Sequence, residues 1–192
     1  MADRIAPRAS AFQTRTIVVG LGNPVLGDDG VGWRVADEVE ERLRAVREAG
    51  GAIQAVEVER LGVGGLRLME FLAGYDAAIL VDAAEFPGRP LGEVRSCALD
   101  DLDCYAAGHL DSAHDASLAT ALALGRRLGA SLPTRIQTVT VQVQRTDVFS
   151  EELTPEVEAA VPAAASAVVE MLMGTSATPD QRGSEGGRNG LT

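Results

Sequence analysis

The sequence contains no lysine. All 17 of its basic residues are arginine, and 28 acidic residues oppose them, so the formal net charge is −11. An acidic chain has no electrostatic reason to bind nucleic acid non-specifically, and this one lacks the basic stripe that would hold it on an anionic membrane. No apolar run approaches the ~20 residues that cross a bilayer, and residues 1–8 lack the apolar segment of a secretory signal. We therefore expect a cytoplasmic protein with neither a nucleic-acid nor a membrane partner.

Cysteine and histidine are also scarce, with two residues of each. Cys97 and Cys104 cannot build a disulfide framework, and their spacing matches no zinc finger, so we expect reduced thiols. The chain has no Gly-x-Ser-x-Gly elbow, and neither cysteine has a base nearby in the sequence. A covalent nucleophile is therefore not indicated.

The chain nevertheless has enough apolar residues, 46%, for a core. At roughly 150 residues per domain, 192 residues correspond to a single domain. Residues 1–14 read as a disordered lead, and residues 174–192 are rich in Gly, Ser and Thr without any periodicity. We expect one α/β domain over residues 15–173, followed by a disordered tail.

Short apolar runs alternate with amphipathic segments along this domain. The patterns predict strands at 16–20, 53–58, 76–82, 93–98 and 135–144, and helices at 30–48, 66–73, 116–128 and 155–173. Such alternation favours a three-layer α/β/α fold with a mostly parallel, mixed-edge sheet of about five strands, of the phosphorylase/hydrolase-like type. Thr154 and Pro155 resemble an N-cap and first helical residue, whereas Pro162 predicts a kink or the start of a second helix.

The loop after the first predicted strand, residues 20–32, is rich in glycine. It resembles a dinucleotide fingerprint at first, but the third glycine of Gly-x-Gly-x-x-Gly would fall at Val25, and Pro24 would spoil the tight turn. Nucleotide binding is therefore not supported.

Acidic residues follow two of the predicted strands. Asp28 and Asp29 open the first predicted helix, where one could serve as N-cap, and Asp82 ends a buried strand, where it could be a turn acceptor. In parallel sheets the carboxyl ends of the strands line one crevice, which would bring Asp29 and Asp82 to the same edge. Two carboxylates there could share a proton, activate water or hold a cation.

His114 is the better placed of the two histidines. Ser112 to Asp115 has the form of a capping box, with Ser112 as N-cap and His114 as the second helical residue. A helix N-terminus disfavours imidazolium, and neutral imidazole is the form that binds metals. Asp29, Asp82 and His114 together suit Ni or Zn better than Mg or Ca and leave a coordination position open. His109 fits a structural or supporting role.

Four motifs in order resemble the hydrogenase maturation proteases, the peptidases that trim the large subunit of [NiFe]-hydrogenases. The motifs are Gly20–Asn23 with Asp28–Gly32, Ile79–Ala83, Ser112–Asp115 and Leu153–Glu158, and the resemblance spans residues 16–172. It implies an endopeptidase that removes a C-terminal peptide from the Ni-loaded precursor of a hydrogenase large subunit. Asp29, Asp82 and His114 match the family's metal-contacting residues, which makes them the candidate catalytic and metal-binding residues.

The resemblance also implies that the Ni is borne by the substrate, although Zn or Cd could occupy the same ligands. It leaves open whether the metal polarises the scissile carbonyl or only positions the tail while an Asp acts as general base. Many members have an Asp-Gly-Gly-Thr-like segment where this chain has residues 59–65, so the substrate subgroup is open. We expect a monomer.

Two other functions fit parts of the sequence. The three candidate ligands would equally serve a non-catalytic Ni-binding module or chaperone for hydrogenase assembly, which predicts tight Ni binding and no cleavage. Residues 19–24 also resemble the opening of peptidyl-tRNA hydrolase, but the Thr-Arg-His-Asn stretch of that family is missing and the acidic charge argues against tRNA.

Overall fold

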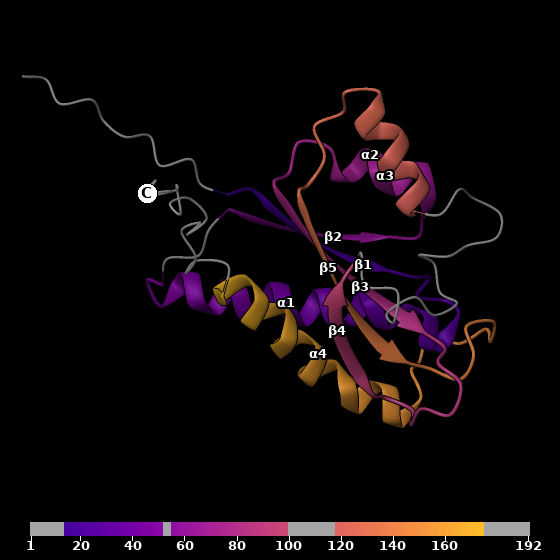
Figure 1. The fold of residues 1–192 in the computed structure, drawn as a ribbon. Coiled ribbons are helices and arrows are strands. Elements are labelled where there is room, and N and C mark those ends of the chain that lie inside the picture. The colour runs from indigo at the N-terminus through magenta and orange to yellow at the C-terminus, as the bar shows by residue number, and fades with distance from the viewer. Residues whose placement is uncertain (1–13, 52–54, 100–117, 175–192) are drawn as a thin grey trace, which may run out of the picture.

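The structure, a computed structural model, describes residues 14–51, 55–99 and 118–174 (Figure 1). Its elements in chain order are β1 (Thr16–Leu21), the 3₁₀ helix η1 (Gly27–Gly30), α1 (Val31–Glu48), β2 (Val56–Leu61), α2 (Gly65–Leu72), β3 (Ala77–Ala84), β4 (Val94–Ala98), α3 (Leu118–Arg127), β5 (Arg135–Gln142) and α4 (Pro155–Gly174). Each predicted strand and helix corresponds to one of these elements. The start of the predicted helix 116–128 and the motif Ser112–Asp115 lie outside the described residues.

The five strands form one sheet in the order β2-β1-β3-β5-β4. β1, β2, β3 and β5 run parallel, and β4 pairs antiparallel with β5 at one edge. Two of the three interior strands, β1 and β3, are buried throughout, as expected of strands covered on both faces. The predicted mostly parallel, mixed-edge sheet is confirmed.

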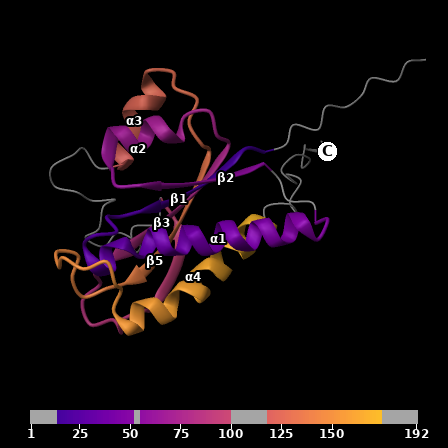
Figure 2. The same cartoon turned by 180° about the vertical axis from the view of Figure 1, so that it is seen from behind.

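Helices cover both faces of the sheet. α1 and α4 pack on one face, and α2 and α3 on the other (Figures 1 and 2). Side chains of β3 alternate between the two layers: Ile79 and Val81 belong to the core under α1 and α4, whereas Ala78 and Leu80 belong to the core under α2 and α3. The three-layer α/β/α architecture follows from this alternation.

The start of α1 packs directly on the backbone of β1 and β3, because its second residue is Gly32. A Cβ at Gly32 would collide with the carbonyl oxygens of Leu21 and Val81. On the approach from β1, Gly22 has a φ of +123°, a conformation that side-chain-bearing residues rarely adopt. These two glycines allow the loop after β1 to turn tightly and bring η1 against the end of β3.

α4 corrects two expectations. It is a single helix from Pro155 to Gly174 that contains Pro162, so the alternative of a second helix starting at Pro162 is wrong. By length and composition, α4 could also cross a membrane, because its most apolar 18-residue window has a mean hydropathy of 1.4. The expectation that no segment reaches that length is therefore wrong on these measures, although α4 packs on α1 and β5 with Val157, Ala164 and Val168 fully buried.

Cys97 lies on β4 and is disulfide-bonded, so the expectation of reduced thiols is wrong for this residue. The hydroxyl of Thr138 on β5 lies 3.0 Å from its sulfur. The second cysteine, Cys104, lies outside the described residues.

Candidate active site at the carboxyl ends of the strands

Asp29 lies in η1, immediately after the loop that leaves β1. Its side chain is completely buried, and its Oδ2 accepts a hydrogen bond of 2.7 Å from the backbone N–H of Asn23. The backbone N–H of Asp29 in turn donates to the carbonyl of Leu26 at 3.3 Å. The loop thus folds around the carboxylate and fixes its direction.

Neither Asp28 nor Asp29 is the N-cap of α1, so the capping hypothesis is wrong for both. The N-cap position is Gly30, and it makes no side-chain capping bond. The turn before α1 is a 3₁₀ helix, and Asp28 directs its carboxylate away from it: Oδ1 accepts from the backbone N–H of Thr154 at 2.7 Å, and Oδ2 accepts from the Thr154 hydroxyl at 3.0 Å.

Asp82 lies within β3 rather than in the loop after it, because the strand continues to Ala84. The hypothesis of a turn acceptor is therefore wrong. Its side chain is 1% exposed, and its partner across the sheet is Thr140 of β5. Asp82 is in phase with Ala78 and Leu80, so it faces the layer of α2 and α3.

The structure places Asp29 and Asp82 at the carboxyl ends of neighbouring strands. β1 and β3 are adjacent and parallel, with Gly20 opposite Val81, and η1 contacts β3. Two buried carboxylates at this edge are the kind of group that needs hydrogen bonds or a cation to offset the loss of water. The arrangement can therefore bind a cation or activate a water molecule.

His109 and His114 lie outside the described residues. His114 precedes Leu118, the first residue of α3, by four positions, and α3 lies on the face of the sheet toward which Asp82 points. Among the described residues alone, no three His, Cys, Asp or Glu side chains gather as a metal site. The role of His114 as the third candidate ligand therefore stays a prediction.

A second feature of this edge is a pocket beside η1, which was not anticipated from the sequence. It has a volume of about 300 Å³ and is lined by Pro24, Val25, Gly27, Gly30, Trp33, Arg34, Asp37, Glu151 and Leu153. The loop after β5 supplies one wall, because the backbone of Ser150 pairs with Val25 and Gly27. Phe149, which directly precedes Ser150 in that loop, is 85% exposed. No local pattern marks this loop, since its role depends on pairing with a segment far away in the chain.

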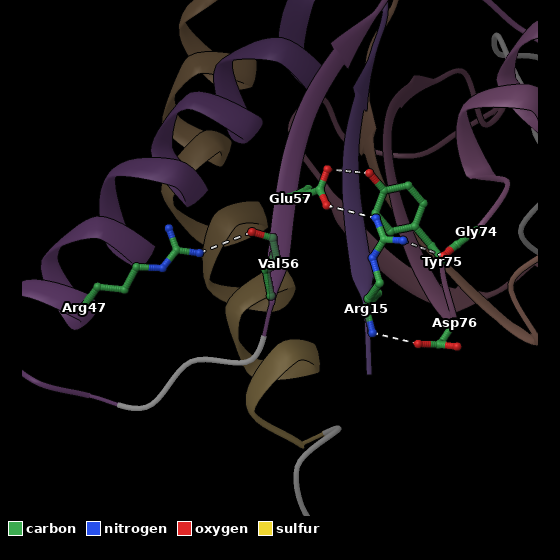
Figure 3. Close-up of polar contacts among 7 residues, drawn as sticks. All are labelled: Arg15, Arg47, Val56, Glu57, Gly74, Tyr75 and Asp76. Carbon is green, nitrogen blue, oxygen red and sulfur yellow. Dashed lines mark hydrogen bonds and ion pairs between the residues drawn. The ribbon is translucent and has the colours of Figure 1, made fainter. Parts of the chain in front are cut away.

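A polar cluster of a different kind lies at the amino ends of the strands, opposite the candidate site (Figure 3). Arg15 joins the amino ends of the strands by donating to Glu57 on β2 and to the carbonyl of Gly74, while its backbone N–H donates to Asp76. The phenol of Tyr75 donates to Glu57 at 2.6 Å. These contacts close the end of the domain remote from Asp29 and Asp82.

Comparisons with known proteins agree with this architecture. The family model of the hydrogenase maturation proteases (HycI) matches residues 33–171, a range that contains Asp82 and His114 and begins just after Asp29. No curated protein matches the chain.

Solved structures of other proteins have a similar fold. The hydrogenase maturating endopeptidase HybD from E. coli is 24% identical with a TM-score of 0.65, over 84% of this chain and 94% of that one. The hydrogenase 2 maturation peptidase from Thaumarchaeota archaeon SCGC_AB-539-E09 is 28% identical with a TM-score of 0.55, over 83% and 98%. The [NiFe] hydrogenase maturation protease HybD from Thermococcus kodakarensis is 22% identical with a TM-score of 0.56, over 83% and 99%. These structures share the fold of this chain. The family match, which covers residues 33–171, shows that the chain belongs to the hydrogenase maturation proteases, a family of endopeptidases.

Proposed function

We propose that this protein removes a C-terminal peptide from the Ni-loaded precursor of a [NiFe]-hydrogenase large subunit. The observation that carries the proposal is the family match, which covers residues 33–171. We assign the peptidase to residues 15–173 as a single domain that acts as a monomer, and we expect residues 174–192 to be dispensable for cleavage. We place the reaction in the cytoplasm.

We further propose that Asp29, Asp82 and His114 contact the Ni of the substrate. An incomplete Ni site in the precursor has open coordination positions, and two carboxylates with a neutral imidazole are a donor set that Ni accepts. The buried positions of Asp29 and Asp82 support this role, as does the hydrogen bond that orients Asp29 through Asn23. Zn or Cd would fit the same donors when the protein is offered those ions alone.

In this proposal the metal serves recognition, so that only a loaded precursor is cut. The chain contributes rigidly held carboxylates: Asp82 is fixed by the central strand and Asp29 by its loop. Contacts to the Ni hold the tail of the precursor in place, which converts cleavage into a reaction between positioned groups.

The test is a processing assay with purified precursor, prepared with and without Ni and read by intact mass. We expect loss of a short C-terminal peptide only from the Ni-loaded sample. Asp29→Asn, Asp82→Asn and His114→Ala should each abolish cleavage and keep the fold. Asp76→Asn is the matched control, because Asp76 lies at the amino end of β3, where it binds the backbone of Arg15.

Full activity in all three site variants would show that the ligand assignment is wrong. An unchanged precursor mass, with tight Ni binding by the free protein, would instead favour the non-catalytic Ni-binding module. Cell extract that does cut the same precursor is the control for a competent substrate.

A further inference from the structure

Asp28 in η1 contacts a part of the chain that is distant in sequence. It is 6% exposed, and both of its carboxylate oxygens bind Thr154, a residue 126 positions away that directly precedes α4. A carboxylate that accepts two hydrogen bonds from one residue is held in both position and rotation. Asp28 thus ties η1 to the start of α4.

The same loop segment is tied a second time by backbone hydrogen bonds. Gly27 N–H donates to the carbonyl of Ser150 at 2.7 Å, and Ser150 N–H donates to the carbonyl of Val25 at 3.1 Å. Ser150, in the loop after β5, therefore forms hydrogen bonds with the segment just before η1, while Thr154 forms hydrogen bonds with η1 itself. These contacts come from a single connection, residues 143–154, between β5 and α4.

Asp29 is the next residue after Asp28 in a helix with about three residues per turn, so the two carboxylates point roughly 120° apart. Asp28 faces Thr154, while Asp29 faces Asn23. Because η1 is only four residues long, a shift at Asp28 must be passed on to Asp29. The direction of the Asp29 carboxylate is thus set from two sides, by Asn23 and by the Asp28–Thr154 contact.

We infer that Asp28 and Thr154 are positioning residues: they hold η1 so that the Asp29 carboxylate meets the Ni of the substrate, and Asp28 itself is not a metal ligand. This inference rests on the proposed function. It gives Asp28, for which the sequence offers only a capping role, a function distinct from that of Asp29, and it assigns a role in metal recognition to the residue that precedes α4.

The test uses the full chain and two forms of the precursor. The kcat/KM for cleavage of Ni-loaded precursor reports all contacts, and the inhibition constant of Ni-free precursor reports docking without the metal. Thr154→Val removes the hydroxyl and keeps the backbone N–H that binds Asp28. We expect it to lower kcat/KM about tenfold, the effect of one hydrogen bond to a charged group, with the inhibition constant unchanged.

Two further variants complete the test. Thr154→Ser keeps the hydroxyl and should restore kcat/KM to within about twofold of the original protein. Asp28→Asn disturbs both bonds and should lower kcat/KM at least as far as Thr154→Val does. Thermal melting of each variant confirms that the fold is retained, and Asp28→Asn keeps the test valid if Thr154→Val fails to fold.

An equal loss in both measurements would show that the contact serves the fold or docking only, which overturns the inference. A Thr154→Ser variant that fails to restore kcat/KM would overturn it as well. Failure of the proposed function looks different: Asp29→Asn would then cut Ni-loaded precursor at the normal rate, and the positioning role would be overturned together with it.

Discussion

Among single residues, Tyr75 shows how the end of the domain remote from the candidate site responds to pH. Partial burial raises the pKa of its phenol to about 12, and the hydrogen bond to the carboxylate of Glu57 acts in the same direction (Figure 3). The same contact lowers the pKa of Glu57, together with its bond to Arg15. Both groups are thus held in the protonation states that keep the cluster together at neutral pH.

Tyr75 should therefore make the folded state sensitive to alkali. Its pKa is raised above the ordinary value of 10, so its contribution to stability is complete below pH 10 and is lost as the pH rises toward about 12. An ultraviolet titration of phenolate absorbance should show one of the two tyrosines ionising near pH 12. Tyr75→Phe should remove this late step and flatten the decline in the free energy of unfolding; a late step that persists in the variant would contradict the assignment.

The residues of the candidate site differ in how far the sequence could identify them. Asp29 and Asp82 could be selected because each follows a recognisable apolar strand, and the carboxyl ends of parallel strands share an edge. The role of Asp28 could not be predicted from the sequence, because its partner Thr154 is 126 residues away. An acidic residue beside the start of a helix is ordinarily read as a cap. The fold and the burial of these residues could thus be predicted from local patterns, whereas the separate role of Asp28 beside Asp29 required the tertiary structure.

At the scale of elements, α4 carries a proline that its packing does not require. Pro162 is exposed in the middle of the helix and has no N–H to donate to the preceding turn. Pro155, by contrast, is the first residue of α4, where the missing N–H has no partner in the helix. The two positions form a matched pair for measuring what an interior proline costs in this helix.

Pro162→Ala should stabilise the protein. The gain in helix propensity is about 3 kcal/mol, and the greater freedom of the unfolded chain offsets about 0.4–1 kcal/mol of it. The net increase in the free energy of unfolding should therefore be about 2 kcal/mol. Pro155→Ala should give no gain. Urea denaturation measures both; a loss of stability in Pro162→Ala would mean that the ring makes a contact worth more than the missing hydrogen bond.

Element boundaries were harder to predict than the elements themselves. β3 extends two residues beyond its predicted end at Asp82, because Ala83 and Ala84 still pair with β5. Pro162 was expected to kink the helix or to start a second one, but no second helix starts there, and Val157, Ala164 and Val168 are buried on both sides of it. In both cases packing against neighbouring elements overrode the local signal.

At the scale of the whole molecule, the proposed contact between substrate Ni and Asp29 would bring the substrate onto the loops around η1. The loop after β5 is bound to this region through Ser150, and the two residues before Ser150 are exposed, Phe149 by 85% and Val148 by 42%. Figure 1 shows this orange loop beside the indigo start of the chain's first helix, and Figure 2 shows the same proximity from behind. An exposed aromatic ring on a fixed loop is a typical anchor for a protein partner.

Phe149→Ser should therefore weaken docking of the precursor without affecting recognition of the metal. We expect KM for Ni-loaded precursor and the inhibition constant of Ni-free precursor to rise by the same factor, about tenfold for a single aromatic anchor, with kcat unchanged. This pattern is the opposite of that expected for Thr154→Val, which spares the Ni-free form. Leu128→Ser is the matched control, because Leu128 is 78% exposed but follows α3 in the other helical layer. Equal effects of the two substitutions, or an effect of Phe149→Ser on the Ni-loaded precursor alone, would show that the loop after β5 is not the docking surface.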